Sequence, residues 1–188
     1  MNCIIIHGCP SNKEKSMDQK TRTYDKHWMP WLKEKLEEKG IKVEIPLMPA
    51  PWEPDYELWK KEFSKLTVNK NTILVGHSCG GGFLVRWIDE SKIKIGKLIL
   101  VSPGKVGKAR NEFKSNFYGN KVIKNINKYI TENIVIFTSN DDIPGHIKGA
   151  YEYEKELPAK IIFLRNHGHF CEEDMGTKEF PELLNEII

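Results

Sequence analysis

The chain has 188 residues, of which 39% are hydrophobic and 29% charged, with a formal net charge of +3, which is ordinary for one folded domain with a sizeable core. It contains no run of about 18 apolar residues, which excludes a helix that crosses a membrane. The N-terminal apolar run, Cys3 to Ile6, is too short for the core of a signal peptide, so a cytoplasmic protein is expected.

Six short apolar runs alternate along the chain with segments whose apolar residues recur at helical spacing. The runs, each typical of a β-strand, are Cys3 to Ile6, Lys42 to Pro46, Thr72 to Val75, Lys97 to Val101, Ile134 to Thr138 and Lys160 to Leu164. Helical patterns lie around residues 28–36, 55–66, 83–88 and 180–187. The alternation predicts βαβ units and a parallel sheet with right-handed crossovers. No repeat, linker or low-complexity tract suggests a second domain.

The third run ends in Gly76-His77-Ser78-Cys79-Gly80, a G-x-S-x-G motif followed by a helical pattern. Between a strand and a helix, this motif predicts a nucleophile elbow, a strained turn that exposes the serine at its apex. The alternative is a glycine-rich turn that only needs close packing or binds a phosphate, and Gly80-Gly81-Gly82 is compatible with it. The phosphate-binding motifs G-x-x-x-x-G-K-[ST] and G-x-G-x-x-G are absent here, so Ser78 is the candidate nucleophile.

A nucleophilic serine needs a histidine to accept its proton and a carboxylate to orient that histidine. The fifth run leads into Asp141 and Asp142, and the sixth leads into His167 and His169. This is the chain order serine, carboxylate, histidine that elbow-type enzymes use. One aspartate could instead cap the helix that begins near Pro144. The pattern predicts a Ser-His-Asp triad, but it leaves open which aspartate and which histidine take part.

Acyl transfer also needs two backbone N–H donors for the negative charge that develops on the carbonyl oxygen, which together form an oxyanion hole. In a doubly wound sheet, the loops after the first and third strands lie side by side. Cys79 follows Ser78 and is predicted to supply one donor. Cys9 is predicted to supply the other, because the next residue, Pro10, has no N–H.

The cysteines show neither a C-x-x-C motif nor an evenly spaced framework, so reduced thiols are expected; the four are Cys3, Cys9, Cys79 and Cys171. A metal site at His167-x-His169-x-Cys171 is an alternative interpretation of the last loop. Such a site would need a second ligand cluster, and the sequence shows none. No metal and no cofactor are therefore expected.

Residues 105–128 are strongly basic, with seven lysines and arginines against one glutamate, which gives this stretch a net charge of +6. A solvated surface is the simplest interpretation, and attraction of an anionic substrate or of nucleic acid is the alternative. No nucleic-acid motif accompanies the charge, so nucleic-acid binding is not expected. Residues 104–128 are also the candidate for a small cap over the site.

Four stretches carry a family resemblance: Gly76 to Gly80, Phe137 to Asp142, His167 to Phe170 and the tryptophan-rich His27 to Trp31. Together they resemble the small single-domain serine hydrolases of the α/β-hydrolase fold related to retinoblastoma-binding protein and to the bacterial YdeN type. The resemblance implies one α/β-hydrolase domain over residues 1–188, with about six mostly parallel strands in the order 2-1-3-4-5-6 and helices on both faces. It also implies that Asp142 and His169 complete the triad with Ser78.

The expected function is that of a carboxylesterase-like serine hydrolase, which cleaves small carboxylic esters or related acyl compounds through an acyl-enzyme on Ser78. A hydrolase-fold module that binds a protein or ligand with little turnover is the alternative from another class. A cysteine hydrolase built on Cys79 is a third interpretation. A small acyl substrate is the expected partner, and no membrane association is expected. A protein partner, and the choice between a monomer and a small homo-oligomer, stay open.

Overall fold

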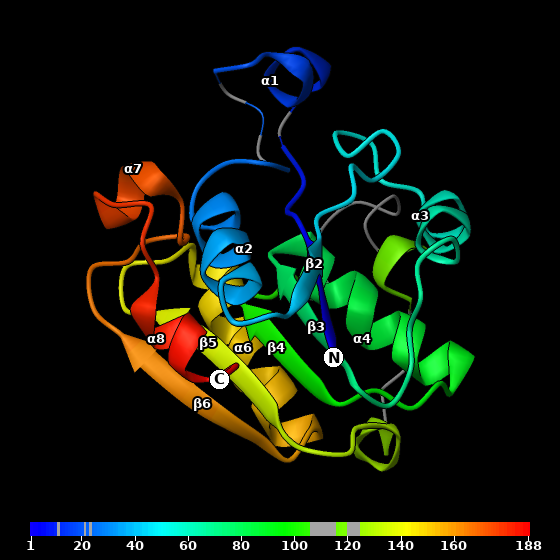
Figure 1. Ribbon diagram of the computed structural model, residues 1–188. Helices are drawn as coiled ribbons and strands as arrows, with labels where there is room; N and C mark the ends of the chain where they lie inside the picture. Colours follow the sequence, from blue (N-terminus) through cyan, green and yellow to red (C-terminus); the bar gives the residue numbers. More distant parts are fainter. Residues whose placement is uncertain (11, 21, 23, 106–115, 120–124) are drawn as a thin grey trace.

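The structure, a computed structural model, describes residues 1–10, 12–20, 22, 24–105, 116–119 and 125–188. Its strands are β1 (Asn2–Ile6), β2 (Lys42–Glu44), β3 (Thr72–His77), β4 (Lys97–Val101), β5 (Ile134–Ser139) and β6 (Ala159–Leu164). They form one sheet in the order β2-β1-β3-β4-β5-β6, in which every pair of neighbouring strands is parallel (Figure 1). The predicted six-stranded α/β-hydrolase sheet and its strand order are confirmed.

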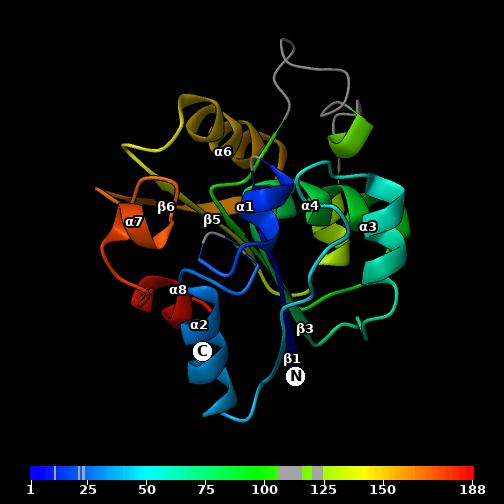
Figure 2. The ribbon, with the colours of Figure 1, turned by 90° about the horizontal axis from the view of Figure 1, so that it is seen from above.

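Helices cover both faces of the sheet, as predicted. They are α1 (Lys13–Met17), α2 (Met29–Glu37), α3 (Tyr56–Phe63), α4 (Cys79–Ser91), the 3₁₀ helix η1 (Ile126–Tyr129), α6 (Pro144–Glu156), α7 (Glu172–Met175) and α8 (Pro181–Asn185). Helices α3, α4 and α6 pack on one face, and α2 and α8 pack on the other (Figure 2). Successive side chains of a strand point to opposite faces of the sheet. Ile4 therefore packs in the core on the side of α3, α4 and α6, and Ile5 packs in the core on the side of α2 and α8. None of the helices in the described part of the chain is long and apolar enough to cross a membrane.

The strand order reverses at β1, which lies between β2 and β3, so the loops after β1 and β3 come together. Close packing at this point requires glycine. A Cβ placed on Gly80 would lie 2.6 Å from the carbonyl oxygen of His7. A Cβ placed on Gly76 would lie 2.7 Å from the backbone nitrogen of Gly81. Gly80 therefore lets the loop after β1 lie against the start of α4, and Gly76 lets the end of β3 lie against the same helix.

Most residues of the predicted cap lie outside the described residues. Of residues 104–128, the structure describes 104, 105, 116–119 and 125–128, so a cap over the site stays a prediction. Within the described part, Arg86 of α4 donates to the carbonyl oxygens of Asn116 (2.5 Å) and Phe117 (3.0 Å). These two bonds hold the short stretch 116–119 on the helix layer that contains α4.

Candidate active site

Ser78 occupies a sharp turn between β3 and α4. Its backbone has φ +52° and ψ −121°, a conformation that non-glycine residues rarely adopt. The Ser78 N–H donates to the carbonyl oxygen of Val101 at 2.9 Å. The Ser78 carbonyl oxygen accepts from the N–H groups of Gly81 at 3.1 Å and Gly104 at 2.7 Å. The strained strand-turn-helix geometry predicted from G-x-S-x-G is present, and backbone bonds from neighbouring loops hold it.

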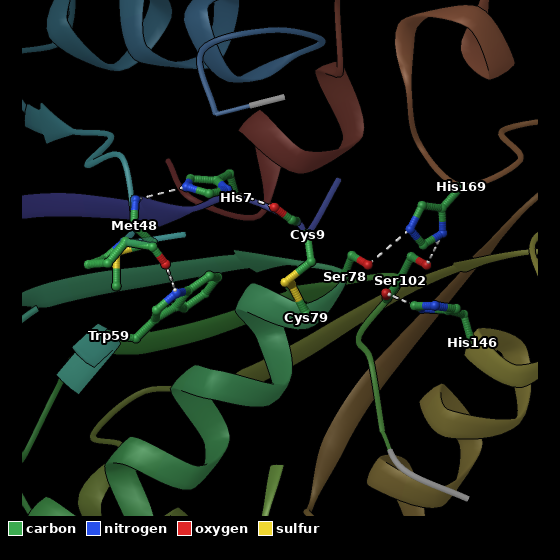
Figure 3. The surroundings of a disulfide bond; sticks show 11 residues. His7, Cys9, Met48, Trp59, Ser78, Cys79, Ser102, His146 and His169 are labelled. Atoms are coloured by element: carbon green, nitrogen blue, oxygen red, sulfur yellow. Dashed lines mark hydrogen bonds between the residues drawn. A yellow bond between two sulfur atoms is a disulfide. The ribbon is translucent and has the colours of Figure 1, made fainter. Parts of the chain in front are cut away.

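The side chains of Ser78, His169 and Asp142 form one hydrogen-bonded line. Ser78 Oγ lies 3.0 Å from Nε2 of His169 (Figure 3), and Nδ1 of the same ring lies 2.8 Å from Oδ1 of Asp142. The serine follows β3, the aspartate follows β5 and the histidine follows β6, so the carboxyl ends of three parallel strands bring them to one edge. Asp142 is only 5% exposed, and burial strengthens its electrostatic attraction for a cationic imidazole.

The other aspartate and the other histidine of these loops take different partners. Asp141 Oδ1 accepts from Ser139 Oγ at 2.5 Å and from the N–H of Gly168 at 2.9 Å, and these bonds lower the pKa of the Asp141 carboxyl. The ring Nδ1 of His167 lies 2.8 Å from the carbonyl oxygen of Arg165. Motif and spacing left open which aspartate and which histidine take part. The fold brings Asp142 and His169, the second residue of each pair, to the serine.

Ser102, which sequence reasoning missed, lies in the same network. It follows β4, is fully buried and has φ +45°. Its hydroxyl donates to Oδ2 of Asp142 at 2.5 Å, and its Oγ lies 2.9 Å from Nδ1 of His169. Because its one proton goes to the carboxylate, the imidazole Nδ1–H is shared between Asp142 and Ser102. One sequence feature indicates Ser102: like Ser78, it comes directly after an apolar strand.

Two further histidines, also missed, support this network. Nε2–H of His77 donates to the carbonyl oxygen of His169 at 2.8 Å, so the motif itself anchors the histidine loop. Burial lowers the pKa of His77 well below its ordinary value, so its ring stays neutral near neutral pH. His146 of α6 donates from Nδ1–H to the carbonyl oxygen of Ser102 at 3.0 Å (Figure 3). Its ring lies 4.5 Å from the ring of His169.

His7 fixes the loop that follows β1. The ring is fully buried; its Nδ1–H donates to the carbonyl oxygen of Gly8 at 2.7 Å, and its Nε2 accepts from the N–H of Met48 at 3.0 Å (Figure 3). One neutral tautomer therefore satisfies both ring nitrogens. Burial lowers the pKa of His7 to about 4, because a charged imidazolium would lose its hydration.

Acidification from pH 6.5 to 4 is expected to destabilise the fold. In that window the unfolded chain, whose histidines titrate near 6.5, binds a proton that His7 in the folded chain does not take up, so the free energy of unfolding falls with the pH. His7 contributes up to roughly 3 kcal/mol of this loss. Thermal unfolding followed by circular dichroism at a series of pH values measures it. His7→Gln should show a shallower pH dependence, and a wild-type Tm that is flat over this window would contradict the expectation.

Cys9 and Cys79, the predicted oxyanion donors, lie beside Ser78. A Cβ placed on Gly8 would be 3.2 Å from Cβ of Ser78, so the loop that carries Cys9 approaches the serine directly. Cys79 is the first residue of α4, where a backbone N–H has no acceptor within the helix. In the part of the chain that the structure describes, neither N–H group donates a hydrogen bond to another residue. Among the described residues, both N–H groups therefore lack an acceptor.

A disulfide joins Cys9 to Cys79, so the expectation of reduced thiols is wrong for these two residues (Figure 3). Their Cα atoms lie 5.9 Å apart, although the two are 70 positions apart in the sequence. Cysteine spacing does not reveal this pairing, because the two residues meet only through the reversal of strand order at β1. Cys79 as a thiol nucleophile is also wrong, since its sulfur is bonded. Cys3 and Cys171 are free.

His27, Cys171 and Glu173 have ligand atoms within 4.8 Å of one another, a spacing at which a metal ion could bind. Nδ1 of His27 already accepts the backbone N–H of Glu172 at 3.0 Å. Burial raises the pKa of the Cys171 thiol to about 12, which disfavours the ligating thiolate. His169, a candidate ligand in the sequence pattern, has both ring nitrogens engaged in the hydrogen-bonded line. These donors fit a metal poorly, and the expectation of no metal and no cofactor stays a prediction.

Comparisons with known proteins found a matching family model and similar proteins of the same fold. A family model described as serine hydrolase matches residues 20–187. The YdeN protein of Bacillus subtilis (strain 168) is 29% identical over 168 residues, which cover 82% of this chain and 83% of that protein. The crystal structure of the ydeN gene product from B. subtilis has a TM-score of 0.78 at 25% identity, covering 99% of this chain and 96% of that chain. Est1E from Butyrivibrio proteoclasticus shares the fold, with a TM-score of 0.65 at 16% identity, covering 98% of this chain and 85% of that chain.

Proposed function

Since this chain belongs to the serine hydrolase family, we propose that it hydrolyses small carboxylic esters or related acyl compounds through an acyl-enzyme formed on Ser78. The observation that carries the proposal is the hydrogen-bonded line from Asp142 through His169 to Ser78. A serine hydroxyl alone is a weak nucleophile near neutral pH, and this line is the arrangement that activates it.

In the proposed reaction, Ser78 Oγ attacks the carbonyl carbon of the ester while Nε2 of His169 takes the hydroxyl proton. The carboxylate of Asp142 stabilises the resulting imidazolium by accepting a hydrogen bond from Nδ1–H of His169. The imidazolium then gives the proton to the leaving alcohol as the ester C–O bond breaks, which leaves the acyl group on Ser78. A water molecule, deprotonated by the same histidine, attacks the acyl-enzyme and releases the carboxylic acid.

The N–H groups of Cys9 and Cys79 are proposed to bind the oxyanion of each tetrahedral intermediate. Cys79 stands at the N-terminal end of α4, a helix of 13 residues, so the positive end of the helix dipole also faces the developing charge. One such donor typically contributes about 10²- to 10³-fold to kcat. This assignment follows from the approach of the β1 loop to Ser78 and from the absence of another acceptor for either N–H among the described residues.

Ser78, rather than Ser102, is proposed as the nucleophile. Ser102 is fully buried, and its hydroxyl proton goes to the carboxylate of Asp142. Its oxygen faces Nδ1 of His169, the nitrogen that also bonds Asp142, so the ring cannot act on it as a base in the same arrangement. Ser78 faces the opposite nitrogen, Nε2, and retains some exposure. Ser102 is therefore a positioning residue for the other two side chains.

Replacing Ser102 with alanine is expected to lower kcat about 10- to 100-fold and to leave KM nearly unchanged, because a hydrogen bond to a charged group contributes roughly 1.5–3 kcal/mol. Steady-state hydrolysis of p-nitrophenyl acetate measures both constants. Ser139→Ala is the matched control, since it removes the same hydroxyl from the end of the neighbouring strand, where it bonds Asp141. Equal losses of kcat in the two variants would contradict a special role for Ser102.

A fluorophosphonate probe followed by peptide mapping tests the proposed function. The probe should attach to the peptide that contains Ser78 and to no peptide that contains Ser102, and labelling should abolish hydrolysis of short-chain p-nitrophenyl esters. A folded protein that neither reacts with the probe nor turns over any ester of the panel would overturn the proposal. That result would favour the binding module considered as the alternative.

A further inference from the structure

The Cys9–Cys79 disulfide connects the two residues whose backbone N–H groups are the proposed oxyanion donors. One sulfur belongs to the loop after β1 and the other to the first residue of α4 (Figure 3). The bond therefore joins the two segments that meet at Ser78, and both cysteine side chains lie outside the hydrogen-bonded line of the triad.

Cys79 has a fixed place whatever the state of its sulfur. It follows Ser78, whose N–H and carbonyl oxygen are both hydrogen-bonded to neighbouring loops, and it begins a helix of 13 residues. The strained turn and the helix therefore position the Cys79 N–H by backbone contacts alone. Breaking the disulfide is expected to leave this donor in place.

Cys9 is restrained much less. Residues 7–10 follow β1 without regular secondary structure. Within the described chain, neither the N–H nor the carbonyl oxygen of Cys9 takes part in a hydrogen bond. His7 anchors the start of the loop, but its bonds run to Gly8 and Met48 and not to Cys9. Among the described residues, apart from partial burial against the core, the disulfide is the contact that ties Cys9 to the helix of Cys79.

We infer that this disulfide positions the Cys9 N–H in the oxyanion hole, so that the oxidised protein is the more active form and reduction lowers the rate of acyl transfer. The inference rests on the proposed function. Cys9 and Cys79 are thus positioning residues through their side chains, in addition to the role of their N–H groups. Loss of the tie weakens stabilisation of the transition state while leaving Ser78, His169 and Asp142 in register.

A dithiol reduces the Cys9–Cys79 disulfide in two steps of thiol–disulfide exchange. A thiolate of the reductant attacks one sulfur of the disulfide, the S–S bond breaks, and a mixed disulfide forms. The second thiol of the reductant, as its thiolate, then displaces the protein sulfur and closes a cyclic disulfide. The protein gains two electrons and two protons as the thiols of Cys9 and Cys79, and the dithiol is oxidised. Oxidation by a disulfide such as oxidised glutathione reverses the reaction.

The test compares kcat and KM for p-nitrophenyl acetate before and after treatment with dithiothreitol, with the reductant removed without air so that its thiols do not attack the substrate. Thiols counted in denaturant should rise from the two free cysteines to all four. Reduction should lower kcat about 10- to 100-fold and leave KM nearly unchanged. This decrease in kcat does not exceed the decrease expected when one oxyanion donor is removed completely. Reoxidation should restore kcat.

Variants separate this effect from other actions of the reductant. The double variant Cys9→Ser/Cys79→Ser should have the low kcat of the reduced protein and should not respond to dithiothreitol. Cys171→Ser, which removes a free thiol near the site, should respond as the wild type does. Far-UV circular dichroism is recorded for each sample. If the double variant fails to fold, the cycle of reduction and reoxidation on the wild-type protein still decides the question.

The outcomes distinguish failure of this inference from failure of the proposed function. Purified protein with all four thiols free, or reduced protein with an unchanged kcat, would overturn the inference and leave the serine hydrolase mechanism intact. A fall in kcat that accompanies loss of the circular dichroism signal would also overturn it, because the disulfide would then act on the fold. Absence of turnover and of probe labelling in both redox states would instead overturn the proposed function.

Discussion

Replacing Ser78 with alanine is expected to lower kcat for hydrolysis of p-nitrophenyl acetate by about 10⁴- to 10⁶-fold. Alanine lacks the oxygen that lies 3.0 Å from Nε2 of His169, so no acyl-enzyme can form. The residual rate is that of a bound ester attacked by water beside the backbone donors. Initial rates at saturating substrate measure the loss, and pre-steady-state kinetics should show no acyl-enzyme burst.

Folding of this variant is checked separately by thermal unfolding. Alanine has the same Cβ as serine, so the strained backbone at φ +52° is equally available to it, and Tm should change little. A Ser78→Ala protein that retained most of the wild-type kcat would show that Ser78 is not the nucleophile. If Ser102→Ala then abolished turnover, the nucleophile would be Ser102.

Replacing Asp142 with asparagine is expected to lower kcat about 10⁴-fold, the second largest effect. The amide keeps the shape of the carboxyl but removes the charge that stabilises the imidazolium. In the wild-type protein, Nδ1 of His169 lies 2.8 Å from Oδ1 of Asp142. An amide N–H₂ in that place would favour the tautomer of His169 that carries its proton on Nε2, and this tautomer cannot accept the proton of Ser78. Steady-state rates, with far-UV circular dichroism as the check on folding, measure the effect.

Asp141→Asn is the matched control, because it makes the same chemical change one residue earlier. Asp141 bonds Ser139 and the N–H of Gly168, so its loss should loosen the histidine loop and lower kcat far less. Equal losses in the two variants, or the larger loss in Asp141→Asn, would contradict the assignment of Asp142 as the partner of His169.

The strands were predictable because each is a short apolar run with its own local signal. The predicted runs at 72–75 and 160–164 appear as β3 and β6, each extended by one or two residues. The second run was predicted to reach Pro46, but β2 ends at Glu44. This strand lies at the edge of the sheet, and proline has no N–H to continue the ladder.

The site was predictable to the level of residue type and chain order. The motif around Ser78, the aspartate pair after β5 and the histidines after β6 each lie at a strand end, which topology brings to one edge. Choosing Asp142 and His169 required the family resemblance, because adjacent loop residues offer no local signal about which side chain turns toward the serine. Ser102 went unnoticed for the same reason, since a single serine after a strand is common.

The sequence by itself determined the parallel sheet, the elbow at Ser78 and the order of the candidate triad, because strand periodicity and the G-x-S-x-G turn depend on residues within a few positions of one another. Only the tertiary structure decided that Cys9 is bonded to Cys79, that Ser102 bridges Asp142 and His169, and that His77 holds the histidine loop. These contacts join residues that lie 40 to 92 positions apart in the sequence, and only the order in which the strands pair brings them together. A pairing set by strand order has no counterpart in local sequence pattern.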